Sequence, residues 1–293
     1  MRALIDGDIV AYRCAASVKE DEPVELVINR IDNLMQQILD DTEATEFEFY
    51  IKGEQNFRYK LNPDYKANRT QPKPFHLESA YQYVRDCWNA IPSGIYESDD
   101  MLGIQQRSDS IICSIDKDLL MIPGMHWNFV KLEKQRVSYM DGIRKFWMQM
   151  MIGDTSDNIH GIAGIGPKKA EKLIGWLDDE QEMCDLVYEK YNDPQRFVMN
   201  ANCLWILQRE EGVWANQHNL TLTKECQQEV EATLEYMKSL NLITSTGRGT
   251  MKNETFGTLV NGDGMDSMLA KQAAWTSSME PPSDTQISTS HDS

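Results

Sequence analysis

The chain has 293 residues and a formal net charge of −17, with 41% hydrophobic and 26% charged residues. This length can bury a full core and predicts one large domain with a smaller one. The longest apolar runs are far too short to cross a bilayer and the N-terminus lacks a signal-peptide pattern, so we expect a cytoplasmic protein without a membrane partner. The six cysteines lie far apart without a C-x-x-C pair, which is typical of reduced, packed thiols and disfavours a zinc site.

The negative charge argues at first against a nucleic-acid partner, but its distribution weakens that argument. Acids gather in the tail, on helix surfaces and at the ends of apolar strands. The basic residues form two local groups: Lys52, Arg58, Lys60, Lys66, Arg69 and Lys73, then Lys168, Lys169 and Lys172. Because the local field governs phosphate capture, and bound metal ions would cancel part of the negative charge, DNA stays a candidate partner.

Short apolar runs alternate with longer helical patterns, which predicts βα units around a mainly parallel sheet, an α/β fold. The clearest strands are residues 3–5, 47–51 and 111–115. Helical spacing of apolar residues predicts helices at 24–39, 77–90 and 142–152. The last of these carries several Trp and Met side chains, which we interpret as core: Phe146, Trp147, Met150 and Met151.

The composition changes near Gly153. From there the pattern is helical, at residues 167–177, 180–191, 194–208 and 224–240. Beyond Thr244 the sequence is rich in Ser, Thr, Gly and Asn and has too little apolar surface to order itself. We therefore predict a sheet-containing domain at 1–152, a helical region at 153–243 and a disordered tail at 244–293.

Acidic residues recur where elements of this sheet end. In an open α/β sheet, chemistry lies beyond the carboxyl ends of the strands. The acids there form four groups: Asp6 and Asp8, Glu97 with Asp99 and Asp100, Asp116 with Asp118, and Asp154 with Asp157. Any one group alone reads as a helix cap or a turn, and Ser98 would be a good helix start. Together they are harder to explain as caps.

Crowded carboxylates need cations. Two carboxylates about 5 Å apart repel by roughly 3 kcal/mol at an effective dielectric near 20. Oxygen ligands without nearby His or Cys favour the hard ions Mg²⁺ or Mn²⁺. Two such ions roughly 4 Å apart can activate a water and stabilise the leaving oxygen in an in-line displacement at phosphorus.

A basic pair lies in a polar stretch before the 77–90 helix. Lys66 and Arg69 are three residues apart and can point together at a phosphate if the stretch turns helical. Arg offers a planar fork and Lys a compact charge, a useful pair for a scissile diester. A pair of this spacing is usually a solvated surface, so its value rests on the acids around it.

A glycine-rich segment follows the last acids. Gly161, Gly164 and Gly166 permit a tight hairpin, and Pro167 suits the first position of a helix whose N–H groups would face a phosphate. Lys168 and Lys169 add charge that holds DNA backbone without reading sequence. A dinucleotide-binding loop needs G-x-G-x-x-G directly after a strand, and the order here is reversed, so we reject it.

With these groups in hand, the chain resembles the 5′-nuclease superfamily: flap endonucleases, the 5′-nuclease domain of bacterial DNA polymerase I and bacteriophage 5′→3′ exonucleases. It is most similar to the replication exonucleases of short-tailed bacteriophages. The resemblance covers about residues 1–176. It is carried by Leu4-Ile5-Asp6-Gly7-Asp8, Pro63-Asp64-Tyr65-Lys66-Ala67-Asn68-Arg69, Glu97-Ser98-Asp99-Asp100, Ser114-Ile115-Asp116-Lys117-Asp118 and Gly153-Asp154-Thr155-Ser156-Asp157-Asn158, followed by residues 161–170.

The resemblance implies a PIN-like fold followed by a helix–hairpin–helix element, and a metal-dependent 5′→3′ exonuclease that hydrolyses duplex DNA in bacteriophage DNA replication or host DNA degradation. It implies catalytic roles for Lys66, Arg69, Asp6 and Asp100. It implies that the ligands of a first metal ion are Asp6, Glu97, Asp99, Asp100 and Asp116. It implies that a second ion is held by Asp118, Asp154 and Asp157. It assigns DNA contacts to Tyr65, Lys66, Arg69, Gly161, Gly164, Gly166, Lys168 and Lys169, and a K⁺ ion to the hairpin.

Two departures from the family pattern matter. The family carries an aspartate soon after the second strand, where this chain has Ile51-Lys52-Gly53-Glu54, and Glu54 is the candidate substitute. The segment between Arg69 and Glu97 is short, so we do not expect an extended helical arch. Exonuclease action is therefore favoured over the threading of a long 5′ flap.

Two alternatives stay open. Asp6-Gly7-Asp8-Ile9-Val10 imitates the nucleophile motif of haloacid-dehalogenase-type phosphatases, with Asp6 phosphorylated and Asp8 as acid/base. A metal-stabilised DNA-binding protein without catalysis is the other. The sequence leaves open the preference for 5′ ends over flaps, action on RNA–DNA hybrids, binding of other replication proteins by the tail, and oligomeric state.

Overall fold

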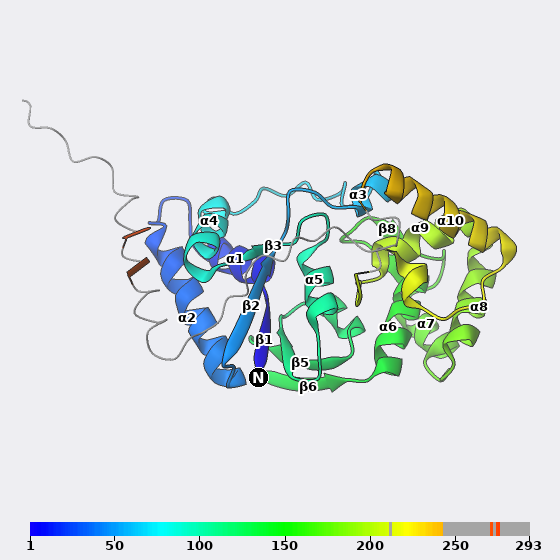
Figure 1. The fold of residues 1–293 in the computed structure, drawn as a ribbon, viewed down its shortest axis with the longest axis horizontal. Helices are drawn as coiled ribbons and strands as arrows, with labels where there is room; N and C mark the ends of the chain where they lie inside the picture. The colour runs from blue at the N-terminus through cyan, green and yellow to red at the C-terminus, as the bar shows by residue number, and fades with distance from the viewer. Residues whose placement is uncertain (211–212, 243–269, 272–273, 276–293) are drawn as a thin grey trace, which may run out of the picture.

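A six-stranded sheet lies at the centre of the computed structural model, which describes residues 1–210, 213–242, 270–271 and 274–275 (Figure 1). The strand order is β3-β2-β1-β4-β5-β6, and β6 runs antiparallel to β5 while the other neighbours pair in parallel. The strands are β1 (Arg2–Asp6), β2 (Glu46–Ile51), β3 (Ile91–Pro92), β4 (Ser110–Cys113), β5 (Gly124–Asn128) and β6 (Glu133–Val137). The predicted mainly parallel α/β sheet is confirmed.

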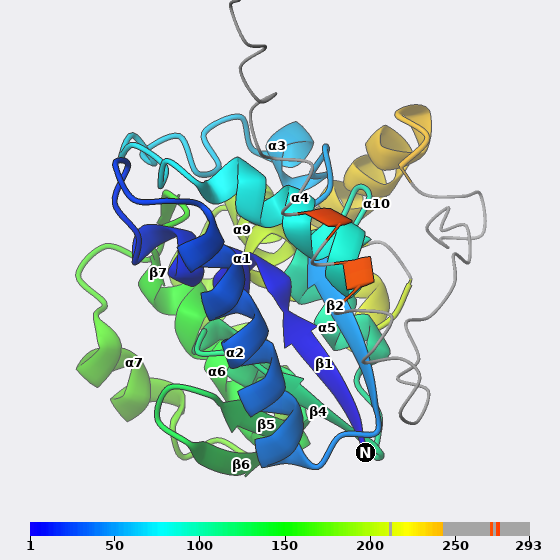
Figure 2. The ribbon, with the colours of Figure 1, turned by 90° about the vertical axis from the view of Figure 1, so that its left-hand side faces the viewer.

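Helices cover both faces of the sheet. Ala3 and Ile5 point to one face of β1 and Leu4 to the other, as the two-residue period of a strand requires. The first face packs against α1 (Gly7–Ala16), α2 (Glu25–Thr42) and α4 (Leu77–Trp88). The second packs against α5 (Ser98–Gln105) and α6 (Tyr139–Ile152), as Figures 1 and 2 show.

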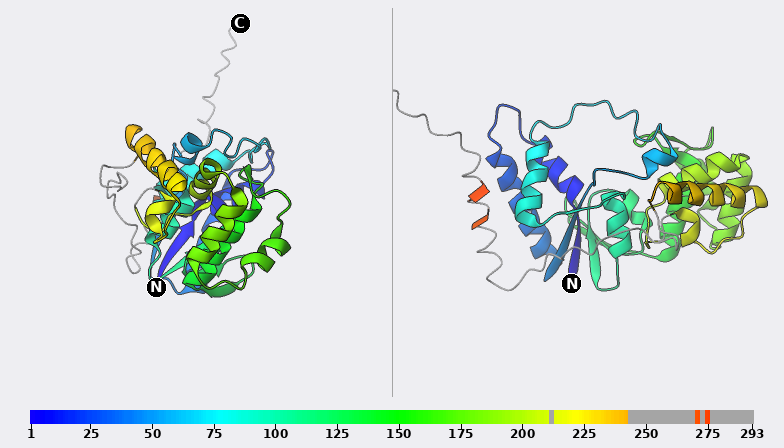
Figure 3. Two further views of the ribbon diagram at one scale, coloured as in Figure 1. Left: turned by 90° about the vertical axis from the view of Figure 1, so that its right-hand side faces the viewer. Right: turned by 45° about the horizontal axis from the view of Figure 1, so that its top comes forward.

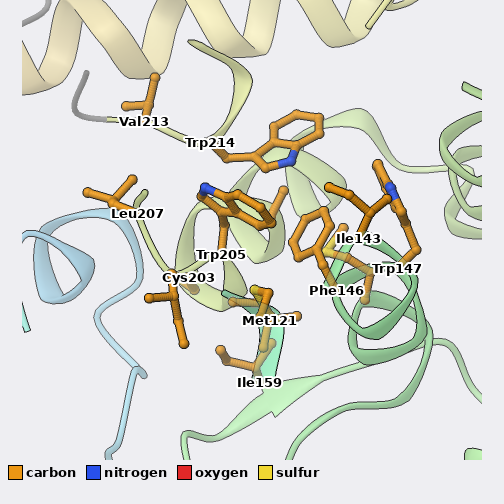
Figure 4. Close-up of a cluster of buried hydrophobic side chains, with 14 of the residues drawn as sticks. Met121, Ile143, Phe146, Trp147, Ile159, Cys203, Trp205, Leu207, Val213 and Trp214 are labelled. Carbon is orange, nitrogen blue, oxygen red and sulfur yellow. The ribbon is translucent and has the colours of Figure 1, made fainter. Parts of the chain in front are cut away.

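A helical region follows α6 and shares its core. Its elements are β7 (Gly153–Asp154), β8 (Ile159–His160), α7 (Pro167–Ile174), α8 (Glu180–Tyr191), α9 (Pro194–Leu204) and α10 (Lys224–Ser239), grouped at the end of the molecule away from α2 (Figure 3). Phe146 and Trp147 of α6, predicted as core, are fully buried and lie beside Trp205 and Trp214 (Figure 4). One hydrophobic cluster runs from Leu4 through these side chains into the helical region, so the parts predicted at 1–152 and 153–243 are packed together.

Some elements differ from the sequence prediction. Helix α1 and the β5–β6 hairpin were not predicted; β6 carries mostly exposed polar side chains and so lacks the apolar alternation of a half-buried strand. Helix α9 ends at Leu204 rather than at 208. The Cys203 and Trp205 carbonyls accept hydrogen bonds from Arg58 at 3.0 and 2.8 Å, which holds this backbone in an extended path.

Most of the tail predicted to be disordered, 244–293, lies outside the described residues. Trp275 is an exception: its indole N–H donates to Asp86 Oδ2 at 3.2 Å, and its ring lies 5.2 Å from that of Tyr83 on α4. The six cysteines are all buried and free. Among the residues that the structure describes, no helix combines the length and apolar character needed to cross a bilayer.

Candidate active site

The carboxyl end of β1 meets that of β4 at the point where the strand order reverses. Asp6 ends β1 and caps α1, accepting the Ile9 N–H at 3.2 Å and the Ser114 hydroxyl at 2.6 Å. Burial raises the pKa of Asp6 to about 7, against which the Ser114 hydrogen bond acts, while the negative charges of Asp8 and Asp116 raise it further. A switch point of this kind is where open α/β sheets bind ligands.

Other predicted acids face the same space. Burial, followed by the charges of Asp6, Asp116 and Glu97, holds the pKa of Asp99 well above its ordinary value. Burial likewise raises the pKa of Asp116, and the charges of Asp118 and Asp157 add to that. These carboxylates affect one another because they converge from β1, the start of α5 and the loop after β4. The structure therefore brings together acids that are far apart in the sequence.

The second predicted group lies on the hairpin after α6. Asp154 Oδ1 accepts the Ser156 N–H at 2.7 Å and the Asp157 N–H at 3.3 Å, which fixes the turn between β7 and β8. Asp118 begins a short 3₁₀ helix and accepts Lys145 Nζ at 3.1 Å. Asp157 is near enough to Asp116 to raise its pKa, so this group borders the first.

The basic pair also reaches the acids, through a turn rather than a helix. Residues 63–68 form consecutive turns in which Lys66 adopts a left-handed φ of +59° and donates its N–H to the Asp157 carbonyl at 2.9 Å. Lys66 Nζ is ion-paired with Glu97 and lies 3.7 Å from Asp157 Oδ2. Arg69 Nη2 lies 2.5 Å from Asp157 Oδ1, with the side chain 56% exposed. Both cations thus border the acid cluster and one remains open to solvent.

Tyr65 does not have the role predicted for it. Its side chain is 2% exposed, and its hydroxyl lies 3.0 Å from Glu97 Oε2 and 2.8 Å from Asp157 Oδ2. A buried hydroxyl shared between two carboxylates is not available as a DNA contact. We assign Tyr65 instead to holding Glu97 and Asp157 in place.

Asp100 is likewise placed apart from the acid cluster. It is fully buried and its two oxygens accept four hydrogen bonds: from Arg58 Nη1 at 2.6 Å and Nη2 at 2.8 Å, and from the N–H groups of Glu97 and Leu207, each at 3.0 Å. A carboxylate offers about four lone-pair sites, and all are used here. The predicted metal-ligand and catalytic roles of Asp100 do not fit this arrangement.

Asp8 and Glu54 point elsewhere. Asp8 accepts the Lys52 N–H at 3.0 Å, the Tyr81 hydroxyl at 2.9 Å and the Ser98 hydroxyl at 2.7 Å, so it ties α1 to β2, α4 and α5. It is thus held in place rather than free beside Asp6 as a phosphatase acid would be. Glu54 is exposed. In the stretch 51–54, where the family's aspartate is lacking, the Lys52 backbone N–H donates to Asp8 instead.

Sequence reasoning missed two groups that contact Glu97. Asn56 Nδ2 donates to Glu97 Oε1 at 2.8 Å, and Arg58 Nη1 lies 3.6 Å from Glu97 Oε2. Burial alone would raise the pKa of Glu97, but Arg58 and Lys66 outweigh it and hold the pKa below its ordinary value. In the sequence Arg58 is only one member of a basic group, because its burial depends on a partner more than forty positions away.

The glycine-rich segment joins the β7–β8 hairpin to α7. A Cβ on Gly161 would lie 2.3 Å from the Ile152 carbonyl carbon, so this glycine is needed for close packing rather than for access to a ligand. Gly164 has a φ of +74° and, like Gly166, has open space around it. Gly166 caps α7, with Pro167 in its first turn, and Lys168 and Lys169 are exposed beside it. The part of this segment that can meet a phosphate is therefore 164–169.

The acids have the oxygen ligands that a hard cation prefers, but their side chains are not close enough together to bind one. Within the described part of the chain, no three His, Cys, Asp or Glu side chains lie close enough together to hold a metal ion as they stand. Burial raises the pKa of Asp6, Asp99 and Asp116, and the charges of neighbouring acids raise it further, so a bound cation would stabilise their ionised forms. An all-oxygen donor set of this kind fits Mg²⁺ or Mn²⁺.

Comparison with known proteins agrees with this geometry. Residues 1–146 match the family model for the 5′-3′ exonuclease, N-terminal resolvase-like domain. The chain is 28% identical over 203 residues to DNA polymerase I of Rhizobium leguminosarum, and 25% identical over 197 residues to flap endonuclease Xni of Shewanella baltica. These matches cover 62% and 58% of this chain, and the chain spans 18% of the polymerase and 72% of the flap endonuclease.

The solved structures show the same fold. A flap endonuclease of bacteriophage T5 in complex with DNA and metal ions is 14% identical, with a TM-score of 0.52 over 81% of this chain and 99% of its own. The T5 5′-exonuclease with bound zinc is 16% identical, with a TM-score of 0.52 over 80% of this chain and 99% of its own. The 5′-nuclease fold predicted from the motifs is confirmed.

The N-terminal half of the chain, residues 1–146, therefore belongs to the 5′-3′ exonuclease family. The relatives reported above are a flap endonuclease and a DNA polymerase I. The family resemblance predicted from Asp6, Glu97, Asp99, Asp116 and the motifs around them is confirmed.

Proposed function

We propose that this chain is a metal-dependent 5′ nuclease that hydrolyses phosphodiester bonds of duplex DNA close to a 5′ end. The observation that carries the proposal is the convergence of Asp6, Asp99 and Asp116 at the switch point of the sheet, with Lys66 and Arg69 on its border. Family membership adds support, since the relatives are nucleases. The names of two structural neighbours, which mention DNA or divalent metal ions, are consistent with it.

Two groups of acids would hold two Mg²⁺ or Mn²⁺ ions. Asp6, Glu97, Asp99 and Asp116 would serve the first, and Asp118, Asp154 and Asp157 the second. When bound, such ions supply a water of lowered pKa and offset charge on the leaving oxygen. The chain's own part is to fix these carboxylates: Ser114 orients Asp6, Tyr65 spans Glu97 and Asp157, and the hairpin turn fixes Asp154.

Lys66 and Arg69 would bind the scissile phosphate. Arg69 is the more exposed of the two and can meet the DNA first, while Lys66 lies deeper between Glu97 and Asp157. Cations placed where negative charge develops on the phosphate lower the barrier without having to reorganise. Their contribution should therefore appear in the cleavage rate more than in DNA affinity.

Duplex DNA would lie along the start of α7. The open backbone at Gly164 and Gly166, the N–H groups of the first turn, and Lys168 and Lys169 offer phosphate contacts without base readout. A K⁺ ion at this hairpin is part of the proposal, as is recognition of a flap or an RNA–DNA hybrid.

No helix interrupts residues 62–76, between α3 (Arg58–Leu61) and α4, so a helical arch is missing and a preference for exonuclease action follows.

A digestion experiment tests the proposal. Blunt and flapped duplexes labelled at the 5′ or the 3′ end would be incubated with Mg²⁺, Mn²⁺ or a chelator, and the product lengths read on a gel. We expect short 5′-labelled products with either metal and none with the chelator. Tight binding without cleavage would favour a DNA-binding protein, and hydrolysis of nitrophenyl phosphate without DNA cleavage would favour the phosphatase; either result contradicts the proposal.

A further inference from the structure

A buried ion pair lies directly behind the acid cluster. Arg58 is 2% exposed and Asp100 is fully buried, and they form a bidentate pair with distances of 2.6 and 2.8 Å. Burying two charges is costly unless each finds its full set of partners. An ion pair so deep in the protein therefore needs an explanation beyond general stability.

The partners of Arg58 come from two separate parts of the chain, both distant from Arg58 in the sequence. Its Nε donates to the Cys203 carbonyl at 3.0 Å and its Nη2 to the Trp205 carbonyl at 2.8 Å, both beyond the sheet domain. Its Nη1 faces Glu97 Oε2 at 3.6 Å in addition to Asp100. The guanidinium thus joins the end of α9, the start of α5 and its own short helix α3.

Asp100 completes this connection from the side of α5. It accepts the Glu97 N–H at 3.0 Å, which fixes the first turn of the helix, and the Leu207 N–H at 3.0 Å, which fixes the segment after α9. Glu97 and Asp99 lie on this same turn. Where Asp100 is held therefore determines where those two carboxylates point.

We propose that Arg58 and Asp100 form a positioning pair, which sets the first turn of α5 so that Glu97 and Asp99 can hold a metal ion, and that Asp100 itself binds none. The inference rests on the proposed function. It reverses the role that the sequence predicted for Asp100. Groups that orient metal ligands from behind typically change metal affinity or activity about 10- to 100-fold when they are lost.

Removing one member of a buried pair leaves the other charge without a partner and can prevent folding. The test therefore uses the double variant Arg58→Met with Asp100→Leu, in which both charges are replaced by apolar side chains. Its matched control is Arg2→Met with Glu48→Leu, because Arg2 and Glu48 form a 2.7 Å pair in the same sheet, away from its carboxyl edge. The single variant Asp100→Asn completes the set.

Mn²⁺ binding would be measured by calorimetry, giving the affinity and the number of ions per chain, with a melting curve for each protein. We expect the double variant to fold and bind the same number of ions about 10- to 100-fold more weakly. The control should lose melting temperature but keep the Mn²⁺ affinity of the parent.

Three results would overturn the inference in distinguishable ways. A double variant with the affinity of the parent makes the pair a purely structural one. Loss of one bound ion per chain in both Asp100→Asn and the double variant makes Asp100 a metal ligand. A parent that binds no Mn²⁺ removes the proposed metal site and the inference with it.

Discussion

Lys66 Nζ is ion-paired with Glu97, so a cation proposed to bind the scissile phosphate is held by a carboxylate proposed to bind a metal ion. Burial alone would lower the pKa of Lys66, but Glu97 and Asp157 outweigh it and raise the pKa, which keeps the side chain charged. A metal ion and Lys66 therefore compete for Glu97. Metal binding would free Lys66 for phosphate.

This competition predicts opposite effects of one substitution. In Lys66→Met, Glu97 loses its competing cation, so Mn²⁺ should bind more tightly, by roughly 1 kcal/mol or about fivefold. DNA cleavage should fall by about 10²- to 10³-fold, because a cation at the reacting phosphate is lost. Calorimetry and a cleavage assay measure the two quantities. The control is Lys60→Met, which removes an exposed lysine nearby and should change neither; weaker Mn²⁺ binding in Lys66→Met would contradict the competition.

We expect Arg69 to contribute mainly to the cleavage rate, and Lys168 and Lys169 mainly to DNA affinity. Arg69→Ala should lower the cleavage rate about 10²-fold with little change in DNA affinity. Lys168→Ala with Lys169→Ala should leave the rate at saturating DNA nearly unchanged, weaken duplex binding, and reduce the slope of log affinity against log salt by about 1 for each lysine. Binding would be measured in Ca²⁺ at several salt concentrations.

The matched control for charge is Lys134→Ala with Arg136→Ala, which removes the same charge from exposed positions of β6. It should change neither the slope nor the rate. Equal loss of affinity in all of these variants would mean that the roles assigned to the two groups are wrong.

Parts of this site could be predicted from the sequence because they follow from local pattern. Asp6 and Asp116 come directly after apolar runs, and the carboxyl ends of parallel strands must share one edge of the sheet. The pairing of Arg58 with Asp100 could not be predicted, since it depends on the packing of α3, α5 and the end of α9. Asp100 in the sequence looks like one more acid in Glu97-Ser98-Asp99-Asp100, and only its rotation about the helix axis sets it apart from the adjacent Asp99.

The free energy of unfolding of the metal-free protein, measured in the presence of a chelator, should depend on pH through Asp6. Its pKa is raised by burial to about 7 in the folded state, from 3.8. Between those values the folded state keeps a proton that the unfolded state releases. The contribution of Asp6 to the free energy of unfolding therefore falls as pH rises from about 4 to about 7, and is constant above that.

Asp6→Asn removes this effect and should stabilise the metal-free protein relative to the parent. The gain should be near zero at pH 4 and reach a few kcal/mol, about 4 at most, above pH 7. Urea unfolding in chelator at pH 4, 5, 6, 7 and 8 measures the difference between the two proteins. A constant difference across this range would show that Asp6 is ionised in the folded protein throughout.

The last prediction separates the nuclease from the phosphatase by comparing Asp6→Asn with Asp8→Asn. In the nuclease Asp6 is a metal ligand, so Asp6→Asn should remove most metal-dependent cleavage even though it stabilises the fold. Asp8 receives hydrogen bonds from the Lys52 N–H and from the Tyr81 and Ser98 hydroxyls. In Asp8→Asn one acceptor oxygen is replaced by an NH₂ group, which cannot accept a hydrogen bond. The free energy of unfolding should therefore fall by about 1–3 kcal/mol, while cleavage largely survives. A phosphatase would instead need both residues and form a phosphoaspartate on Asp6. Duplex digestion by both variants, with a beryllofluoride probe on the parent, distinguishes the two: equal loss of activity with the probe bound at Asp6 would overturn the nuclease assignment.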